Sequence, residues 1–272
     1  MKLGIIAGNR TLPILLAQRI QENNKNNEVI AIGLNGETSF CIKKYVNKVY
    51  WIGVGQLGKL QEVLAEEGIK HCVVAGQINP LRIFKRKGWD KKLISLVDSI
   101  QDFRPHTIFA EIIAYLEKTG ITFLDSTFYL KDDLAEEGIM NKALGIDAIS
   151  GDIDFGIKII SKFVDLDVGQ TIAVKSKSVV ALESLEGTDR AIRRAHCLAG
   201  KKCLVFKFSK NNQDLRFDVP VVGVSTLRLL KNIGASGLVL ESGKVIIIEK
   251  EKFLYLAGKW KIPIVGKRKI NK

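Results

Sequence analysis

Strand-like and helix-like segments alternate along the first half of the chain, and this alternation restricts the fold more than any other sequence feature. Apolar runs typical of buried strands stand at residues 3–7, 29–34, 49–54, 71–75 and 121–124. Stretches with helical spacing lie between them, at residues 12–20, 56–67 and 106–116. Such alternation is typical of a parallel sheet that is covered on both faces and has right-handed connections. The sequence therefore predicts an α/β, Rossmann-like or flavodoxin-like N-terminal domain over residues 1–130.

The second half of the chain follows a different pattern. The 272 residues exceed the commonest size of a single domain, and residues 131–152 are polar with weak periodicity, which indicates a linker. Beyond it we expect helices at 153–164, 189–199, 225–232 and 249–260, with Ser225 as a cap, and strands near 171–175, 178–182, 203–208, 219–222, 237–240, 244–248 and 262–265. Ser242 and Gly243 predict a hairpin between two of these strands. This mixture predicts a separate α+β catalytic domain over residues 153–272.

The charge of the chain favours an anionic partner. The formal net charge is +13, but the lysines are dispersed, with small clusters at Lys85-Arg86-Lys87 and Lys267-Arg268-Lys269. A phosphorylated substrate or an anionic membrane surface fits this charge, and so does a simple contribution to solubility. No helix–turn–helix, zinc-finger or RNP motif is present, so we expect no nucleic-acid partner.

The cysteines and the apolar runs indicate the cellular location of the protein. The four cysteines are Cys41, Cys72, Cys197 and Cys203, and no two form a C-x-x-C pair. We therefore expect reduced, mostly buried thiols and a cytoplasmic protein. No run approaches the ~18 apolar residues of a membrane span, and the apolar start is too short for a signal peptide.

The first predicted turn, Gly8-Asn9-Arg10, follows the first strand, where ligands commonly bind in parallel sheets. It lacks the G-x-G-x-x-G pattern of dinucleotide-binding turns, so we do not favour a nucleotide-cofactor oxidoreductase. Two interpretations stay open for this turn: contact with a nucleotide or pyrophosphate, or a purely structural connection between a strand and a helix.

Two carboxylates flank a guanidinium in the stretch K-F-S-K-N-N-Q-D-L-R-F-D-V-P, which begins at Lys207. If this stretch is extended, Asp214, Arg216 and Asp218 share one face. Carboxylates are ligands for Mg²⁺ and arginine grips phosphate, so the pattern suits a site for both. The alternative is a solvated edge strand with a local ion pair.

A second polar cluster, E-S-L-E-G-T-D, precedes the helix predicted from residue 189. Thr188 or Asp189 would cap this helix, whose N-terminus is a natural anion site. An ordinary strand–turn–helix connection accounts for the pattern equally well.

Five stretches, in order along nearly the whole chain, are similar to motifs of one family. They read L-G-I-I-A-G-N-R-T-L-P, V-V-A-G-Q-I-N-P, E-S-L-E-G-T-D-R-A-I-R-R-A, K-F-S-K-N-N-Q-D-L-R-F-D-V-P-V-V-G and S-T-L. The chain thereby resembles the LpxI family of UDP-2,3-diacylglucosamine pyrophosphatases. The resemblance implies Mg²⁺-dependent hydrolysis (with another divalent cation as the alternative) of UDP-2,3-diacylglucosamine to UMP and 2,3-diacylglucosamine 1-phosphate, or lipid X, in lipid A biosynthesis.

The resemblance further implies two unlike domains with the lipid held in the crevice between them, a homodimer, and a cytoplasmic enzyme at the surface of the inner membrane. An aspartate of the C-terminal domain is essential in the family. By motif position Asp218 is our first choice and Asp214 our second, each as metal ligand or base, with Arg216 as a third catalytic residue.

The remaining predicted site residues are assigned to substrate binding. They are Gly8, Asn9, Arg10, Gly76, Gln77, Glu186, Gly187, Thr188, Asp189, Lys207 and Gln213. Lys207 would bind non-bridging oxygens, Gln213 would position water or sugar, and Glu186 would be an outer-shell or metal ligand.

Besides the hydrolase, two further function classes stay open: a nucleotide-cofactor oxidoreductase, and a non-enzymatic binder of nucleotide or anionic lipid. Such a binder would show steeply salt-dependent association without turnover. It gives no reason for paired aspartates at positions 214 and 218, which would repel a polyanion.

Overall fold

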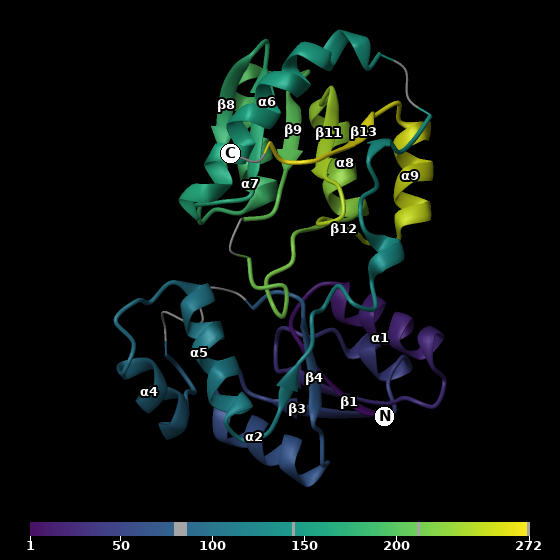
Figure 1. The fold of residues 1–272 in the computed structure, drawn as a ribbon. Helices are drawn as coiled ribbons and strands as arrows, with labels where there is room; N and C mark the ends of the chain where they lie inside the picture. Colours follow the sequence, from purple (N-terminus) through teal and green to yellow (C-terminus); the bar gives the residue numbers. More distant parts are fainter. Residues whose placement is uncertain (79–85, 143–144, 211–212, 271–272) are drawn as a thin grey trace. The chain divides into compact units, whose positions relative to one another are not determined.

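The computed structural model describes residues 1–78, 86–142, 145–210 and 213–270, which divide into two compact units (Figure 1). One unit comprises Met1–Leu130 together with Asp214–Asp218, and the other comprises Lys131–Gln213 and Val219–Lys272. The sequence had grouped residues 153–272 in one domain. In the structure, the short segment 214–218 packs instead with the N-terminal unit. Asn79 and Pro80 of the second family motif and Lys85 of the first basic cluster lie outside the described residues.

The N-terminal unit is built on a five-stranded parallel sheet, so the predicted α/β class is confirmed for this half. Its strands are β1 (Lys2–Ala7), β2 (Glu28–Leu34), β3 (Lys48–Ile52), β4 (His71–Ala75) and β5 (Thr122–Phe123). The spatial order is β3-β2-β1-β4-β5, and the direction of winding reverses between β1 and β4. In open α/β sheets, ligands bind beyond the carboxyl ends of the strands at such a reversal. The finer assignment to a Rossmann-like fold stays a prediction.

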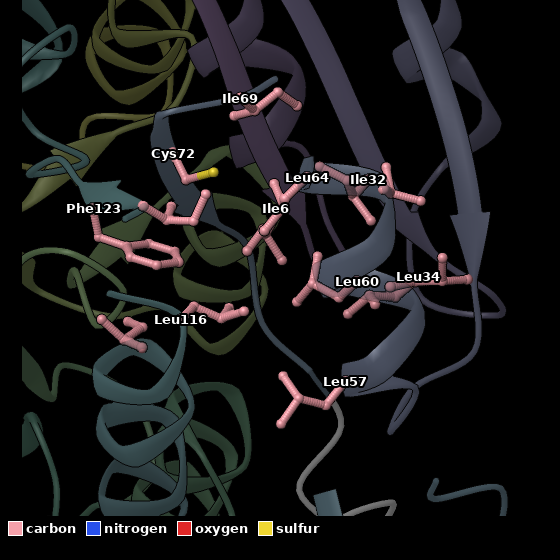
Figure 2. Close-up of a cluster of buried hydrophobic side chains, with 14 of the residues drawn as sticks. Ile6, Ile32, Leu34, Leu57, Leu60, Leu64, Ile69, Cys72, Leu116 and Phe123 are labelled. Carbon is pink, nitrogen blue, oxygen red and sulfur yellow. The ribbon is translucent and has the colours of Figure 1, made fainter. Parts of the chain in front are cut away.

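Helices cover both faces of this sheet, as its continuous apolar strands require. The helix α1 (Leu12–Asn23) lies on one face, while α2 (Leu57–Glu66), α4 (Lys91–Asp98) and α5 (Pro105–Glu117) lie on the other. Alternate strand residues point to opposite faces, so Ile6, Ile32 and Leu34 enter one buried hydrophobic cluster with Leu57, Leu60 and Leu116 (Figure 2). The helix α4 was not predicted, although Asp90 caps it and Leu93 and Val97 supply its buried face.

A six-stranded mixed sheet forms the centre of the C-terminal unit, in the order β6-β13-β11-β9-β7-β8. Its strands are β6 (Gly138–Ile139), β7 (Thr171–Lys175), β8 (Ser178–Leu182), β9 (Leu204–Lys207), β11 (Gly237–Glu241) and β13 (Ile264–Lys267). β9, β11 and β13 are parallel, and the other three are antiparallel to their neighbours. The helix α6 (Ser150–Phe163) packs on one face, and α7 (Thr188–Ala199), α8 (Val224–Ile233) and α9 (Lys250–Lys259) pack on the other.

The predicted hairpin around Ser242 and Gly243 is wrong. Both edges of β11 pair with β9 and β13, so the following strand β12 (Ile246–Ile247) pairs in parallel with β10 (Val221–Val222) instead. Ser225 does not cap α8, because the helix starts one residue earlier with Gly223 as its cap residue. The remaining elements are single-turn helices: η1 (Phe40–Lys44), η2 (Lys131–Asp133), η3 (Asp147–Ile149) and η4 (Val164–Leu166).

All four cysteines are free, but only two are buried. Burial raises the pKa of Cys72 to about 12, which makes its thiol inert at neutral pH. The expectation of mostly buried thiols is wrong for Cys41 and Cys197, which are exposed.

Candidate active site

The segment 214–218 forms a tight turn, so the extended conformation considered for it is wrong. The carbonyl oxygen of Asp214 accepts the backbone N–H of Phe217 at 3.2 Å and that of Asp218 at 2.9 Å. The Asp214 carboxylate also accepts the N–H of Arg216 at 3.0 Å. An aspartate that bonds its own following backbone offers the chain an alternative to a strand. The three charged residues therefore lie in one turn and do not share the face of a strand.

Asp214 and Arg216 form a bidentate ion pair inside this turn. The Arg216 Nε lies 3.0 Å from Asp214 Oδ1, and Nη2 lies 2.7 Å from Oδ2. The remaining guanidinium nitrogen, Nη1, donates to Glu117 at the end of α5 at 2.8 Å. Partial burial alone would raise the pKa of Asp214, but its hydrogen bonds with Arg216 prevail and leave the pKa below the usual range. Both oxygens of Asp214 are thus engaged in holding one guanidinium in place.

Ser126 anchors the turn to the N-terminal unit. Ser126 is only 1% exposed, and its hydroxyl donates toward two backbone carbonyl oxygens, those of Val74 in β4 at 2.7 Å and of Arg216 at 2.9 Å. Its backbone N–H donates to the Leu215 carbonyl at 3.1 Å. The Phe217 ring stacks on Phe109 of α5 with 6.0 Å between centroids. Asp218 therefore closes a turn whose position is fixed beside the carboxyl ends of β4 and β5.

Two predicted glycine turns meet where the winding of the sheet reverses. The Gly8 N–H donates to Ala75 at 2.8 Å and the Asn9 N–H donates to Gln77 at 2.7 Å, so the two turns are bonded to each other. A Cβ added at Gly8 would lie 2.5 Å from the Gln77 carbonyl oxygen, and one at Gly76 would lie 2.5 Å from that of Asn9. Both glycines are therefore required for close backbone packing, and the Gly8 and Asn9 amides are not available to a phosphate.

The Arg10 side chain is the part of this turn best suited to a substrate. Arg10 is exposed and has a left-handed backbone, with φ of 68°. Within the described ranges, no acidic side chain pairs with its guanidinium. A cation at the carboxyl end of β1 is placed where open α/β sheets bind ligands.

Sequence reasoning missed Glu37 and Thr38, which follow β2 at the same edge. Asn9 Nδ2 donates to Glu37 Oε2 at 2.8 Å. The Thr38 hydroxyl donates to the Ala7 carbonyl and accepts the Leu34 N–H at 2.8 Å, so it fixes the turn after β2 against the end of β1. The sequence signal that could have identified Glu37 and Thr38 was their position just after the strand predicted at residues 29–34.

In the C-terminal unit, Lys207 and Thr188 come together in a largely buried polar group. Lys207 ends β9 and is 7% exposed, and its Nζ donates to the Thr188 hydroxyl at 2.7 Å. That hydroxyl donates to Glu183 Oε1 at 3.0 Å and lies 3.3 Å from the Thr171 hydroxyl. We call Thr171, Glu183, Thr188 and Lys207 the Lys207 group. Glu183 and Thr171 were not assigned from the sequence, because Thr171 begins β7 and Glu183 follows β8, and only the sheet brings these positions together.

The start of α7 differs from the prediction in its cap. Gly187, with φ of 82°, is the cap residue, and no side chain of Thr188 or Asp189 caps the helix. Thr188 and Asp189 instead occupy the first turn, where Asp189 Oδ1 accepts a long 3.4 Å hydrogen bond from Thr226. The N–H groups of a helix's first turn lack intrahelical acceptors, so this end still favours an anion.

Glu186 and Gln213 are less open to a ligand than predicted. Glu186 forms an ion pair with Arg194 at 2.5 Å, and this hydrogen bond lowers the pKa of Glu186. Gln213 Oε1 accepts the Lys210 N–H at 2.9 Å, and its Nε2 is buried without a hydrogen-bond partner among the described residues.

The described residues could hold a metal ion only if a bound substrate supplied further ligands to it. Within the described residues, no group of three or more His, Cys, Asp or Glu side chains could hold a metal ion. Mg²⁺ commonly takes one or two carboxylates, with water and substrate phosphates completing its octahedron. Of the two predicted ligands, Asp214 is engaged by Arg216 through both of its carboxylate oxygens.

The predicted site residues thus form two groups, one in each unit. Gly8, Asn9, Arg10, Gly76 and Gln77 meet at the edge of the N-terminal sheet, and the same unit holds the turn 214–218. Gly187, Thr188, Asp189 and Lys207 meet in the C-terminal unit. In the described part of the chain, no helix has both the length and the apolar composition needed to cross a bilayer.

Comparisons with known proteins give a consistent result over the whole chain. The family model described as LpxI N-terminal domain matches residues 2–133, and that of the LpxI C-terminal domain matches residues 136–265. A curated relative from Caulobacter vibrioides, named UDP-2,3-diacylglucosamine pyrophosphatase LpxI, is 24% identical over 276 residues, which cover 97% of each chain.

Solved structures are much less similar. The biotin carboxylase domain of the Hydrogenobacter thermophilus 2-oxoglutarate carboxylase is 12% identical with a TM-score of 0.28, covering 72% of this chain and 41% of that one. The N5-carboxyaminoimidazole ribonucleotide synthetase from Thermotoga maritima is 14% identical with a TM-score of 0.23, covering 67% and 41%. Neither likeness bears on fold or function.

Proposed function

This chain belongs to the LpxI family, and we propose that it hydrolyses the pyrophosphate bond of UDP-2,3-diacylglucosamine. The products would be UMP and 2,3-diacylglucosamine 1-phosphate, or lipid X, on the route to lipid A. The observation that carries the proposal is the match of both LpxI domains, in order, over residues 2–133 and 136–265. The name of the Caulobacter relative, which matches over 97% of each chain, supports the choice of substrate.

The turn 214–218 supplies the first set of proposed roles. Cleavage of a pyrophosphate depends mainly on positioning and on stabilising charge on the phosphate oxygens. Arg216 is proposed to bind a non-bridging oxygen, because two carboxylates, Asp214 and Glu117, hold its planar guanidinium in one orientation. Asp214 then acts as a positioning residue, and this role replaces that of metal ligand.

We propose Asp218 as the carboxylate that would hold Mg²⁺ or another divalent cation, or that would accept a proton from the attacking water. A bound Mg²⁺ would supply charge neutralisation at the phosphates and a lower pKa for a bound water. Asp218 fits this role because the turn fixes its backbone, with its N–H bonded to Asp214 at 2.9 Å, and because it is only half-buried.

Arg10 and Lys207 are proposed as further cations for the substrate. Arg10 is exposed at the carboxyl end of β1, where the winding of the parallel sheet reverses. Lys207 is largely buried and already oriented by Thr188 at the start of α7, so it would present its charge at little cost in side-chain entropy. Glu186 is not among the proposed ligands, since Arg194 neutralises it.

The reaction is tested by measuring UMP release from UDP-2,3-diacylglucosamine in detergent micelles, with Mg²⁺ or with EDTA. We expect metal-dependent release by the wild-type protein. A folded wild-type protein that releases neither UMP nor lipid X would refute the proposed substrate. A homodimer stays a prediction, which static light scattering tests.

A further inference from the structure

One surface of the N-terminal unit is both aromatic and basic, and none of the roles proposed above uses it. It is formed by η1 and by β3, the strand at the edge of the five-stranded sheet. We call it the Phe40 surface, and its members are Phe40, Cys41, Lys43, Lys44 and Trp51.

The fold holds the Phe40 ring outward. Within η1, Ile42 is fully buried and fixes the turn to the unit, so Phe40 and Cys41 face solvent. Phe40 is 72% exposed, and its ring contacts Trp51 with 4.6 Å between centroids. Trp51 in turn lies against Gly33 of β2, where an added Cβ would come within 2.8 Å of the indole. A large exposed aromatic side chain is thus supported from beneath by a second one.

Positive charge surrounds these rings. The Lys43 Nζ lies 5.8 Å from the centroid of Phe40 and 5.9 Å from that of Trp51, and Lys43 and Lys44 are exposed. The stretch 38–51 contains three lysines and no acidic residue. Aromatic rings of this kind lie at the headgroup level of a bilayer, while lysines place their amines among anionic phosphates.

We propose that the Phe40 surface docks this protein on an anionic lipid bilayer. Phe40 enters the boundary between headgroups and acyl chains, Trp51 lies behind it, and Lys43 and Lys44 contact lipid phosphates. The inference rests on the proposed function, because a substrate with two acyl chains is embedded in a membrane. A second copy of the chain is a poorer occupant, since a two-fold symmetric contact would bring the same lysines of both copies together.

The exposed cysteine in this surface allows a direct test. In a Cys197→Ser variant, Cys41 is the one exposed cysteine, because Cys72 and Cys203 are buried. We would attach an environment-sensitive fluorophore to Cys41 and add vesicles of equal parts phosphatidylglycerol and phosphatidylcholine. The emission should shift to the blue and return on addition of salt. A Cys41→Ser variant labelled at Cys197 is the matched control and should show no shift.

Two variants and a matched control separate the contribution of the aromatic ring to vesicle binding from the contribution of the lysine charges. In vesicle co-sedimentation, Phe40→Ser should weaken binding about tenfold, because an inserted ring is lost. Reversal of both lysines, Lys43→Glu with Lys44→Glu, should weaken it roughly thirtyfold or more, given about fivefold for each lysine at an anionic surface. Phe128→Ser, which removes another exposed aromatic ring of the same unit (57% exposed), should leave binding unchanged. All variants should keep the wild-type melting temperature, since the changed side chains are exposed.

Three outcomes would overturn the inference: no shift at Cys41, equal shifts at Cys41 and Cys197, or a dimer that Phe40→Ser converts to monomers in light scattering. The last outcome would assign the surface to contacts between copies. The proposed function and the proposed role of the Phe40 surface can be refuted independently. A protein that releases UMP in detergent but ignores vesicles keeps the function and loses the Phe40 surface, whereas one that binds vesicles without releasing UMP does the reverse.

Discussion

The turn 214–218 and the Lys207 group are two polar centres of the described structure, and they are built in opposite ways. The turn pairs Asp214 with Arg216, two residues apart, and both side chains are about one-third exposed. The Lys207 group takes its members from four separate positions along the chain, of which Thr171 and Lys207 are buried and Glu183 and Thr188 are half-buried. The first centre depends on local sequence, and the second depends on the topology of its sheet.

This difference determines what each centre loses when one partner is removed. Around the turn, water can replace a missing partner, so a broken ion pair there has a modest effect on stability. In the Lys207 group, Lys207 and Thr171 are buried, so an ammonium without its partner there is more destabilising than at the turn. We therefore expect substitutions in the turn to act on catalysis, and substitutions in the Lys207 group to act on stability first.

The largest effect is expected from Asp218→Asn. If Asp218 holds the metal or accepts the proton, the rate of UMP release should fall by about a thousandfold or more. The isosteric amide keeps the turn, so the melting temperature should stay near that of the wild type. Asp214→Asn is the matched control, for which we expect a loss of only about tenfold. Equal losses in both variants would contradict the separate roles assigned to the two aspartates.

Thr188→Val should have the largest effect on stability. The change is nearly isosteric, but it deprives the buried Lys207 Nζ and Glu183 Oε1 of their shared hydroxyl. The free energy of unfolding, measured with urea, should fall by about 2–4 kcal/mol. Thr188→Ser, which keeps the hydroxyl, should restore most of it. A stable Thr188→Val protein would show that water reaches this group.

Ser126→Ala tests the anchor of the turn. The serine hydroxyl bonds the carbonyls of Val74 and Arg216, and it is almost fully buried. Its loss should lower the free energy of unfolding by about 1–2 kcal/mol and should also reduce the rate of UMP release, because Arg216 is less well positioned. Thr127→Ala is a control at the next position, and its rate should stay unchanged even if its stability falls.

The smallest effect should come from the Asp214–Arg216 pair at acid pH. The pKa of Asp214 lies below its ordinary 3.8 in the folded state, so the pair stabilises the fold above that pH and is lost as pH falls through the lower folded value. At neutral pH, Asp214→Asn should lower the free energy of unfolding by about 1 kcal/mol. In urea titrations this difference from wild type should shrink toward zero in strong acid. A difference that persists at the lowest pH would mean that the stabilisation is not electrostatic.

The sequence allowed the strands and helices of the N-terminal unit to be predicted well, because buried parallel strands are continuous apolar runs. The runs at residues 3–7 and 71–75 correspond closely to β1 and β4. Their carboxyl ends bring together the turns at Gly8 and Gly76, which the family motifs had marked separately. The structure adds that those glycines are required where two backbones pack closely, a property that one sequence does not reveal, while their assignment to substrate binding stays a prediction.

The errors come from choices that tertiary contacts or side-chain bonds decide. Alternating charges at residues 214–218 were consistent with a strand, but the Asp214 carboxylate bonds the Arg216 backbone and favours a turn. Ser242 and Gly243 were consistent with a hairpin, but β11 had no free edge. The Lys207 group required knowledge that β7, β8 and β9 are neighbours, which no local pattern contains.

Because residues 214–218 complete the N-terminal unit, the order in which the chain is synthesised affects when this unit can fold. A ribosome that has released residues 1–130 has not yet made the segment that covers Phe109 and bonds Ser126. The first unit to emerge therefore waits for most of the second before it can close. Expression of residues 1–130 alone would leave the Phe109 ring without Phe217 and the Ser126 hydroxyl without one of its two carbonyl partners, so the boundary best suited to cutting the protein in two is not a single point in the sequence.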